Sequence, residues 1–470
     1  MNIVFQNGLS KSLSGQYFTP SRWREMVETA MAGQKFIGQK IRYYNVPCAF
    51  DIETTSFRSN GKPDGEKRAI MYEWTLGING YVMIGRTWEE FKMVMDNIVT
   101  RLELDNTHRL MIYVHSLAYE FGFMRKHFKW SKVFAIESKK PVYAITDTGI
   151  EFRCSYLLTG YSLAVLGRNL TKYKVEKRLG DLDYRKIRHS GTPLTDEEIG
   201  YCINDVLVVM AHIQEQIERE KLIMNIPLTK TGYVRRYCRK ACFYGLDGQK
   251  DEEHRKTYYH KMQGLRISPD EYRQLKRAFA GGYTHASAFN ANKVMTYVTS
   301  YDFTSSYPAV MVMEKFPMSS SVVVTVKTED EIIDQCKRFC CLFDLEIFDL
   351  ESVFFADTYL SGYKCKGVVN GQYNNGRLVR AEHLYTTVTD VDFMILRKCY
   401  KWSHIKWANF RRYRRDYLPT DFVKAVLKLY GDKTTLKGVT EKQAEYLSSK
   451  EQINACYRWN DCNGHSARGI

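Results

Sequence analysis

The sequence predicts a multidomain protein of mixed α/β and α+β class. Its 470 residues are enough for two to four domains, each with its own core. Strand-like and helix-like apolar patterns alternate between residues 46 and about 235, which indicates an α/β domain. Further on, residues 380–402 alternate like strands and residues 448–458 have the spacing of a helix face, so we expect an α+β second part.

The composition favours a nucleic-acid partner. The formal net charge is +16, and aromatic residues interleave with Arg and Lys in RRYCRK (235–240), YRQLKR (272–277) and FRRYRRDY (410–417). Such runs suit a phosphate backbone with stacked bases, although any single run is more often a solvated surface. No apolar run is long enough to span a bilayer, so we expect no membrane partner.

Neither the N-terminus nor the cysteines indicate secretion. Residues 1–45 form an N-terminal extension without motifs, and its start lacks the charged and apolar regions of a signal peptide. The twelve cysteines include no CxxC pair, so we expect reduced thiols rather than disulfides or a zinc site. A soluble, cytoplasmic protein is therefore expected.

The first chemical pattern is a pair of acids. In PCAFDIETTSF (47–57), an apolar lead runs into Asp51 and Glu53, which would point to the same face of a strand. Burying two like charges is costly unless cations neutralise them, and a pair of divalent metal ions is the simplest explanation. An edge strand with two exposed acids would look the same.

Two later segments add further acids. YVHSLAYEFGFM (113–124) begins as a strand and becomes an amphipathic stretch that carries Glu120. YCINDVLVVMAHI (201–213) has helical spacing, so Tyr201 and Asp205 share one helix face. The carboxylate could close a metal cage while the tyrosine hydroxyl orients the attacking water.

Together these side chains suit two-metal hydrolysis of a phosphodiester. One ion would generate hydroxide and the other would stabilise the leaving 3′ oxygen. Oxygen ligands favour Mg²⁺ or Mn²⁺ over zinc, with two ions in each active site. The expected catalytic residues are Asp51, Glu53, Glu120, Tyr201 and Asp205.

The three segments resemble the Exo I, Exo II and Exo III motifs of the DEDD-type 3′–5′ exonuclease domain, in the same order. The resemblance implies a ribonuclease H-like fold for residues 46–235, with Ser116 and Tyr119 as DNA contacts. The family usually has Asn where this chain has Ser116, and Asp where it has Glu120. We expect a working nuclease with altered binding of single-stranded DNA.

YDFTSSYP (301–308) follows a strand-like run, and Pro308 ends that element. Taken alone, it is better interpreted as a strand that meets a turn. It also resembles motif A of family B DNA polymerases, Asp-x-x-Ser-x-Tyr-Pro. The resemblance implies that Asp302 binds catalytic metal and that Tyr307 lies under the sugar of an incoming dNTP.

Two flanking segments support that resemblance. RAFAGGYTHAS (277–287) is similar to the aromatic-x-Gly-Gly loop of the family, in which two glycines let the backbone approach a DNA phosphate; a tight turn is the alternative. SSKEQINACYR (448–458) is similar to motif B of the fingers; a surface stripe is the alternative. The implied DNA contacts are Gly281 and Gly282, and the implied nucleotide contacts are Lys450, Asn454 and Tyr457.

The motif order and the interval between motifs A and B resemble the protein-primed subgroup used by phages and linear plasmids. Residues 380–402 look like the TPR1 insertion, which implies a terminal protein as partner; for Asp390 and Asp392 a structural or protein-contact role is expected. The other implied partners are primer-template DNA, single-stranded DNA and dNTPs, with a monomeric enzyme that acts in viral or plasmid replication in the host cytoplasm. The expected divisions are an extension (1–45), the exonuclease domain (46–235), a basic helical linker (236–264), the palm (265–345), a TPR1-like insertion (346–415), the fingers (416–457) and a tail (458–470).

The chain departs from the family after motif B. No Tyr-x-Asp-Thr-Asp motif follows Tyr457, and a one-base slip there would permit the residues that the subgroup usually shows, so we expect residues 458–470 to be out of frame and the palm to be partial. We therefore expect poor polymerisation by this chain alone. A standalone 3′–5′ exonuclease with a DNA-binding palm remnant, or a non-catalytic replication partner, are the alternatives.

Overall fold

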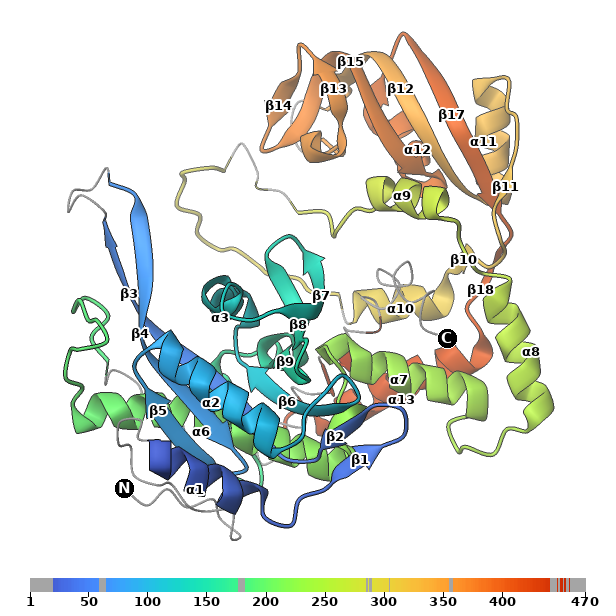
Figure 1. Ribbon diagram of the computed structural model, residues 1–470. Coiled ribbons are helices and arrows are strands. Elements are labelled where there is room, and N and C mark those ends of the chain that lie inside the picture. The colour runs from blue at the N-terminus through green and yellow to red at the C-terminus, as the bar shows by residue number, and fades with distance from the viewer. Residues whose placement is uncertain are drawn as a thin grey trace. The chain divides into compact units, whose positions relative to one another are not determined.

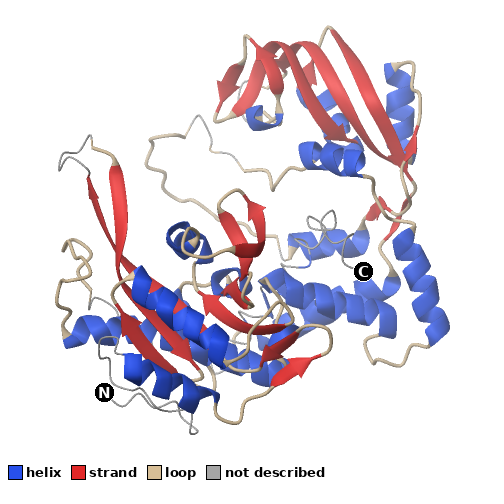
Figure 2. Cartoon of the chain, in the orientation of Figure 1, coloured by secondary structure: helices blue, strands red, loops and turns tan. Residues whose placement is uncertain are grey.

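The computed structural model describes residues 20–58, 65–175, 182–284, 286, 290–303, 305–354, 358–439, 446, 449, 450, 452, 453 and 456. The chain divides into two compact units, Met1–Tyr233 and Val234–Ile470. Helices and strands are mixed in both units, as the predicted class requires (Figures 1 and 2). Within the described part of the chain, no helix has the length and apolarity needed to cross a membrane.

The first unit is built on a nine-stranded sheet. The path through the sheet is β5 (Tyr81–Gly85), β4 (Lys67–Ile78), β3 (Cys48–Arg58), β6 (His108–Val114), β9 (Ile150–Cys154), β8 (Lys140–Thr146) and β7 (Trp130–Glu137), with β1 (Phe36–Gly38) and β2 (Arg42–Tyr44) joined to β6. The central strands β3, β6 and β9 are parallel, and the outer pairs are antiparallel. This arrangement brings the carboxyl ends of β3 and β6 to the same edge.

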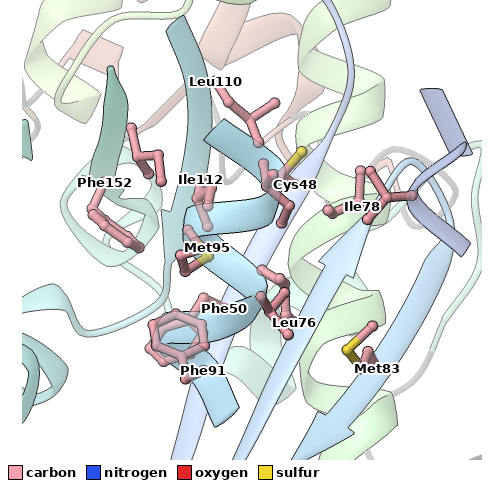
Figure 3. Close-up of a cluster of buried hydrophobic side chains, with 14 of the residues drawn as sticks. Cys48, Phe50, Leu76, Ile78, Met83, Phe91, Met95, Leu110, Ile112 and Phe152 are labelled. Atoms are coloured by element: carbon pink, nitrogen blue, oxygen red, sulfur yellow. The ribbon is translucent and has the colours of Figure 1, made fainter. Parts of the chain in front are cut away.

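Helices cover both faces of this sheet. They are α1 (Pro20–Met31), α2 (Trp88–Arg101), α3 (Leu117–Met124), α4 (Ser155–Thr159), α5 (Leu163–Arg168) and α6 (Asp196–Glu220), followed by the short 3₁₀ turn η1 (Ile223–Asn225). One face packs Phe50, Ile112 and Phe152 against Phe91 of α2 (Figure 3). Trp23 of α1 belongs to the same buried cluster.

The opposite face of the sheet packs against α6. Ala49 of β3 and Met111 of β6 lie in a core with the apolar side of α6. Successive residues of a strand point to opposite faces, so Asp51 and Glu53 share the face of Ala49. The two acids of β3 therefore point towards the side that α6 covers.

The helices that carry predicted site residues form where the sequence indicates. α3 begins directly after β6, as the 113–124 segment predicts. Thr195 is the N-cap of α6: its side chain accepts a hydrogen bond from the Glu198 amide, and the Glu198 carboxylate accepts one from the Thr195 amide. This capping box fixes the start of α6, six residues before Tyr201.

The second unit contains a helical core and a separate sheet layer. Its helices are α7 (Lys230–Tyr244), α8 (Glu252–Gln263), α9 (Pro269–Ala278), α10 (Ser306–Met313), α11 (Glu329–Arg338), α12 (Asp390–Cys399) and α13 (Thr420–Leu436). Cys238 of α7, Met311 of α10 and Phe422 of α13 belong to one buried cluster. Helix α13 lies within residues 416–457, the range predicted for the fingers.

The sheet of the second unit is antiparallel. Its order is β11 (Val322–Val323), β17 (His404–Tyr413), β12 (Cys340–Ser352), β15 (Arg377–Thr389) and β13 (Lys366–Val369), with β14 (Gln372–Asn374) on β15 and β16 (Tyr400–Lys401) on β12; η2 (Gly362–Lys364) precedes β13. A separate two-stranded antiparallel ribbon is formed by β10 (Lys315–Pro317), which precedes β11 in the sequence, and β18 (Arg415–Tyr417), which follows β17. The predicted start of the insertion at residue 346 falls inside β12.

The strand expected before Asp302 does not form. Residues 290–303 have no helix or strand, and Tyr297 and Tyr301 are almost fully exposed. A strand needs a hydrogen-bonded neighbour, and no described strand pairs with this segment. Pro308 does not end an element either: it lies in the first turn of α10, where its missing amide hydrogen leaves no helical hydrogen bond unmade.

The 380–402 segment is only half strand. Residues up to Thr389 belong to β15, but Thr389 caps α12, so the TDVDF stretch is helical. Asp390 accepts a hydrogen bond from the Cys341 amide and pairs with Arg415, while Asp392 completes the capping box at Thr389. These contacts confirm a structural role for both acids. The described cysteines are all free thiols, as expected.

Gly85 offers a test of the packing in the first unit. A Cβ at Gly85 would lie 2.1 Å from the indole ring of Trp74, which is fully buried and donates a 2.8 Å hydrogen bond to the Thr87 carbonyl. Overpacking of this kind costs about 1–3 kcal/mol. Gly85→Ala should lower the urea midpoint of the full chain, measured by circular dichroism. Gly122→Ala, in α3 with no atom near the new Cβ, is the control and should leave the midpoint unchanged or raised; equal midpoints for both variants would contradict this packing.

Candidate active site

Strand β3 and helix α6 bring three carboxylates together. Asp51 and Glu53 lie on the α6 side of β3, and Asp205 lies on the first half of α6. One potential ligand atom from each of the three lies within 4.8 Å of the others. Asp51 is half-buried, and Glu53 and Asp205 are buried. The i, i+2 spacing on the strand and the position on the helix thus produce the predicted cluster.

The position of α6 is fixed beyond its own core. Arg188 is buried and donates hydrogen bonds to Glu198, the residue that completes the capping box of α6. The Arg188 amide also donates to Thr55 of β3, at 2.9 Å. This arginine therefore ties the start of the helix to the strand that carries Asp51, which limits how far the two elements can move apart.

Glu120 completes the predicted set of acids. It lies in the first turn of α3, is 4% exposed and forms a hydrogen bond with Asp51. Burial, and then the charge of Asp51, raise the pKa of Glu120 well above its usual value. Its Oε2 atom is buried and has no hydrogen-bond partner among the described residues. A buried carboxylate oxygen without a donor is an atom that a cation would satisfy.

Tyr201 lies one helical turn before Asp205 on the same face. Burial, followed by the negative charge of Asp205, raises the pKa of Tyr201 above its usual value. The hydroxyl therefore keeps its proton. Its oxygen lies 2.8 Å from the hydroxyl oxygen of Tyr184, an exposed residue that the sequence pattern did not single out. Tyr184 is thus a second hydroxyl beside the acidic cluster.

A fifth carboxylate lies on the same face. Glu73 of β4 is directly opposite Glu53 in the antiparallel pairing of β3 and β4, and it is fully buried. Burial raises the pKa of Glu73 to about 8, even though hydrogen bonds with Thr75 and Cys202 oppose the shift. The Thr75 hydroxyl donates at 2.5 Å. The signal that could have found Glu73 is an acid two residues before Thr75 in an otherwise apolar strand.

The two predicted DNA contacts of the nuclease lie on the surface beside Glu120. Ser116 is the exposed N-cap of α3, and its hydroxyl makes no capping hydrogen bond. Tyr119 is 46% exposed, its hydroxyl is hydrogen-bonded to Thr54, and its ring lies 5.2 Å from that of Phe123. An accessible ring and hydroxyl next to the acids are suitable contacts for a base and a phosphate.

In the second unit, the structure brings the Gly-Gly loop to the motif A tyrosine. A Cβ on Gly282 would lie 2.8 Å from the Tyr307 hydroxyl oxygen, so the backbone approaches this side chain closely; at Gly281 nothing lies within 4 Å. Tyr307 is 42% exposed in the first turn of α10. The serine that precedes α10, Ser305, has a left-handed backbone and accepts a 2.6 Å hydrogen bond from Lys433 of α13.

The remaining predicted polymerase residues do not assemble into a second cluster within the described chain. Asp302 is exposed and belongs to no group of three potential ligands among the described residues. Lys450 is exposed and has helical backbone, as does Ser449 before it. Asn454, Tyr457 and the tail 458–470 lie outside the described residues.

Comparison with known proteins identifies a family. The sequence profile described as DNA polymerase type B, organellar and viral, matches residues 129–457, which is more than half of the chain. No curated protein gives a match.

Several solved structures share the fold. Phi29 DNA polymerase with primer-template DNA, in a post-translocation binary complex, is similar with a TM-score of 0.59 and 14% identity, over 87% of this chain and 67% of that one. Its ternary complex with incoming nucleotides gives 0.57 and 15% over the same shares. The complex with single-stranded DNA gives 0.56 and 14%, over 87% of this chain and 66% of the other.

At these identities the likeness concerns the fold, and it confirms the predicted multidomain class. The family rests on the sequence profile, which begins at residue 129, directly before β7 of the first unit, and ends at residue 457 of the second. Because this profile covers more than half of the chain, the chain belongs to the organellar and viral family of type B DNA polymerases.

Proposed function

We propose that this chain is a DNA polymerase of the protein-primed kind that removes nucleotides from the 3′ end of a DNA strand at the acidic site of its first unit. The observation that carries the proposal is the convergence of Asp51, Glu53 and Asp205, with ligand atoms within 4.8 Å, beside the protonated hydroxyl of Tyr201. Removal of mismatched 3′ nucleotides would serve as proofreading during viral or plasmid replication.

The donor set fits divalent cations. Asp51, Glu53 and Asp205 offer hard oxygen ligands, and Glu120 adds a buried oxygen without a donor. Such ligands favour Mg²⁺ or Mn²⁺, and we propose two ions, as the number of carboxylates suggests. Bound ions of this kind activate water and stabilise the leaving oxygen of a phosphodiester.

The chain's own residues orient the reactants. Tyr201 remains a hydroxyl because its pKa is raised, so it acts as a hydrogen-bond donor and not as a base. Its proton can hold the attacking water in line with the phosphorus, while the hydroxyl of Tyr184 fixes the Tyr201 rotamer. Ser116 and Tyr119, both exposed next to Glu120, are suitable contacts for the terminal nucleotides.

Two carboxyl groups hold protons in the absence of cations. Glu120 shares a hydrogen bond with Asp51, and Glu73 has a pKa of about 8. Each proton removes one negative charge from the crowded face. Cations that bind to Asp51 and its neighbours would favour release of the Glu120 proton, since metal ligation needs the carboxylate form.

The second unit would supply nucleotidyl transfer. Asp302 would bind metal, and Tyr307 would lie under the sugar of the incoming dNTP. Lys450 would contact the phosphates of this nucleotide, Tyr457 would pack on the nascent base pair, and Asn454 would also contact the nucleotide. The approach of Gly282 to Tyr307 supports this assignment, because it joins two segments that the family uses at one primer terminus. A terminal protein that contacts the sheet of β12, β15 and β17 is part of the same proposal, as is a monomeric enzyme in the cytoplasm.

The alternative is a standalone 3′–5′ exonuclease whose second unit only binds DNA. Asp302, exposed and outside any described cluster, favours this alternative. Primer extension with Mg²⁺ and dNTPs separates the two: template-directed extension that Asp302→Ala abolishes supports the polymerase, whereas degradation alone supports the nuclease.

The acidic cluster gives the first test of the nuclease. Asp51→Ala combined with Glu53→Ala should reduce hydrolysis of a 3′ single-stranded oligonucleotide by about 10³-fold or more, because the cations lose two ligands. Binding of the same oligonucleotide should persist. Asp302→Ala is the control and should degrade the oligonucleotide at the wild-type rate. Wild-type protein that leaves the 3′ end intact in Mg²⁺ and in Mn²⁺ would rule out the nuclease.

The hydroxyl of Tyr201 gives the second test. Tyr201→Phe keeps the ring and removes one hydrogen bond to a charged reacting group, so kcat should fall about 10- to 100-fold with KM unchanged. Tyr184→Phe, which removes only the partner hydroxyl, should cost less than Tyr201→Phe. A rise in KM with unchanged kcat for Tyr201→Phe would assign this residue to strand binding instead.

The proton on Glu73 gives a pH test without substrate. In EDTA, the folded chain holds this proton up to about pH 8, whereas an unfolded glutamate loses it near pH 4.5. The unfolded state therefore binds fewer protons between these values, and Glu73 alone should make the free energy of unfolding decrease as pH rises, by at most about 1.4 kcal/mol per pH unit. Glu120, whose pKa is raised as well, adds to this decrease. Glu73→Gln should flatten this dependence.

Glu218→Gln is the matched control for Glu73→Gln. Although burial raises it, the pKa of Glu218 is held at about 2 by hydrogen bonds from Lys172 and Tyr173. Its contribution to stability is lost only as pH falls below about 4.5, so the slope from pH 4.5 to 8 should stay as in the wild type. A wild-type free energy of unfolding that does not change over this range would show that Glu73 is ionised.

A further inference from the structure

The segment between the predicted nuclease and palm is a helical hairpin with a groove. α7 and α8 are joined by residues 245–251, and both lie in the second unit from residue 234 onward (Figure 1). Gly245, with a left-handed φ of 78°, ends α7 and turns the chain. The ring centroids of Phe243 and Tyr258 are 5.0 Å apart, and Nε2 of His254 is hydrogen-bonded to the Cys242 carbonyl oxygen at 3.0 Å. The two helices therefore pack directly against each other.

The groove between α7 and α8 is strongly cationic. It has a volume of about 670 Å³, and five of its ten lining residues are Arg or Lys against one acid, Glu252. Glu252 pairs with Arg255, which leaves an excess of four positive charges. Among the described residues, no carboxylate pairs with Arg239, Lys240 or Lys256. Like charges crowded in this way repel each other, and a polyanion relieves that repulsion.

Aromatic rings lie among these cations. Tyr244 at the end of α7 is 42% exposed, and Tyr259 of α8 is 37% exposed. The Arg255 guanidinium lies 5.5 Å from the centroid of the Tyr244 ring. A solvated basic surface has no need of exposed rings between its charges, whereas rings between cations can stack unpaired bases while the cations contact phosphates.

We propose that this groove binds a single-stranded nucleic acid, with Arg239, Lys240 and Lys256 on the phosphates and Tyr244 and Tyr259 against the bases. A duplex is a poorer occupant, because its bases are already stacked on each other. The site needs neither the acidic cluster nor Asp302, so it is independent of the proposed nuclease and polymerase functions. It gives the chain a second place to hold a strand.

The test uses the full chain in EDTA, where no strand is hydrolysed, with fluorescent oligothymidine as the probe. The triple variant Arg239→Ala, Lys240→Ala, Lys256→Ala should bind at least about tenfold more weakly at 0.1 M salt. The slope of log affinity against log salt should fall by about 2, since three phosphate contacts are lost at roughly 0.7 each. The control Lys337→Ala, Lys398→Ala, Lys401→Ala removes the same charge from exposed positions of the same unit and should change affinity less than twofold.

The rings are tested separately. Tyr244→Ala with Tyr259→Ala should weaken oligothymidine binding roughly fivefold or more and leave binding of an abasic oligonucleotide unchanged, whereas the two Phe substitutions should retain affinity. The proposal is overturned if the charge variant binds within twofold of wild type, if the control loses as much, or if a polyglutamate peptide binds the groove as tightly as the oligonucleotide, which would indicate an acidic protein partner.

Folding and the nuclease are monitored alongside. Circular dichroism and hydrolysis of a trinucleotide in Mg²⁺, a substrate too short to need the groove, should match wild type in the charge variant. If the alanine variant loses its dichroism, the Gln versions of the same three residues repeat the test. A chain that binds through the groove but never hydrolyses the trinucleotide would contradict the nuclease and leave the groove supported.

Discussion

Repulsion between carboxylates is the constraint on which the rest of the first unit depends. Ligand atoms of Asp51, Glu53 and Asp205 lie within 4.8 Å of one another on the sheet face that also carries the buried Glu73 and packs against α6. Because like charges repel, the carboxylates stay close together only if the surrounding structure holds them in place. This support comes from the two hydrophobic cores that pack on the two faces of β3. The capping box of α6 and the buried Arg188 add to it.

Protons are the second means by which the chain tolerates these charges. The raised pKa values of Glu73 and Glu120 have burial as their first cause, and the charge of Asp51 adds to both. The cluster is therefore expected to release protons when bound cations neutralise its negative charge. Folding stability, pH and cation binding become linked through the same few side chains. Glu73 is fully buried opposite Glu53, so its proton affects the charge of the cluster although the side chain cannot contact a substrate.

Local spacing accounts for what could be predicted from the sequence. The i, i+2 pair of Asp51 and Glu53 and the i, i+4 pair of Tyr201 and Asp205 are properties of single elements, and so is the cap at Thr195. The sequence of β4 shows that Glu73 is an acid in an apolar strand, but only the register of β3 against β4 places it opposite Glu53. Tyr184 likewise reaches Tyr201 from a segment without a regular pattern. The strand expected before Asp302 failed for the opposite reason: its local propensity was favourable, but no described strand is present to pair with it.

The proposed nuclease site would repel its own substrate, and a basic surface elsewhere on the chain would offset that repulsion. A nucleic-acid strand is itself a polyanion, so the site that would cut it also repels it until cations intervene. Affinity for the strand must then come from elsewhere: from neutral contacts such as Ser116 and Tyr119 beside the acids, and from cations held apart from them. The position of the positive charges on the chain therefore matters for strand binding as much as the net charge of +16 does. Positive charge concentrated in the groove of α7 and α8, around exposed rings, would hold a strand without neutralising the carboxylates that the proposed hydrolysis requires in charged form.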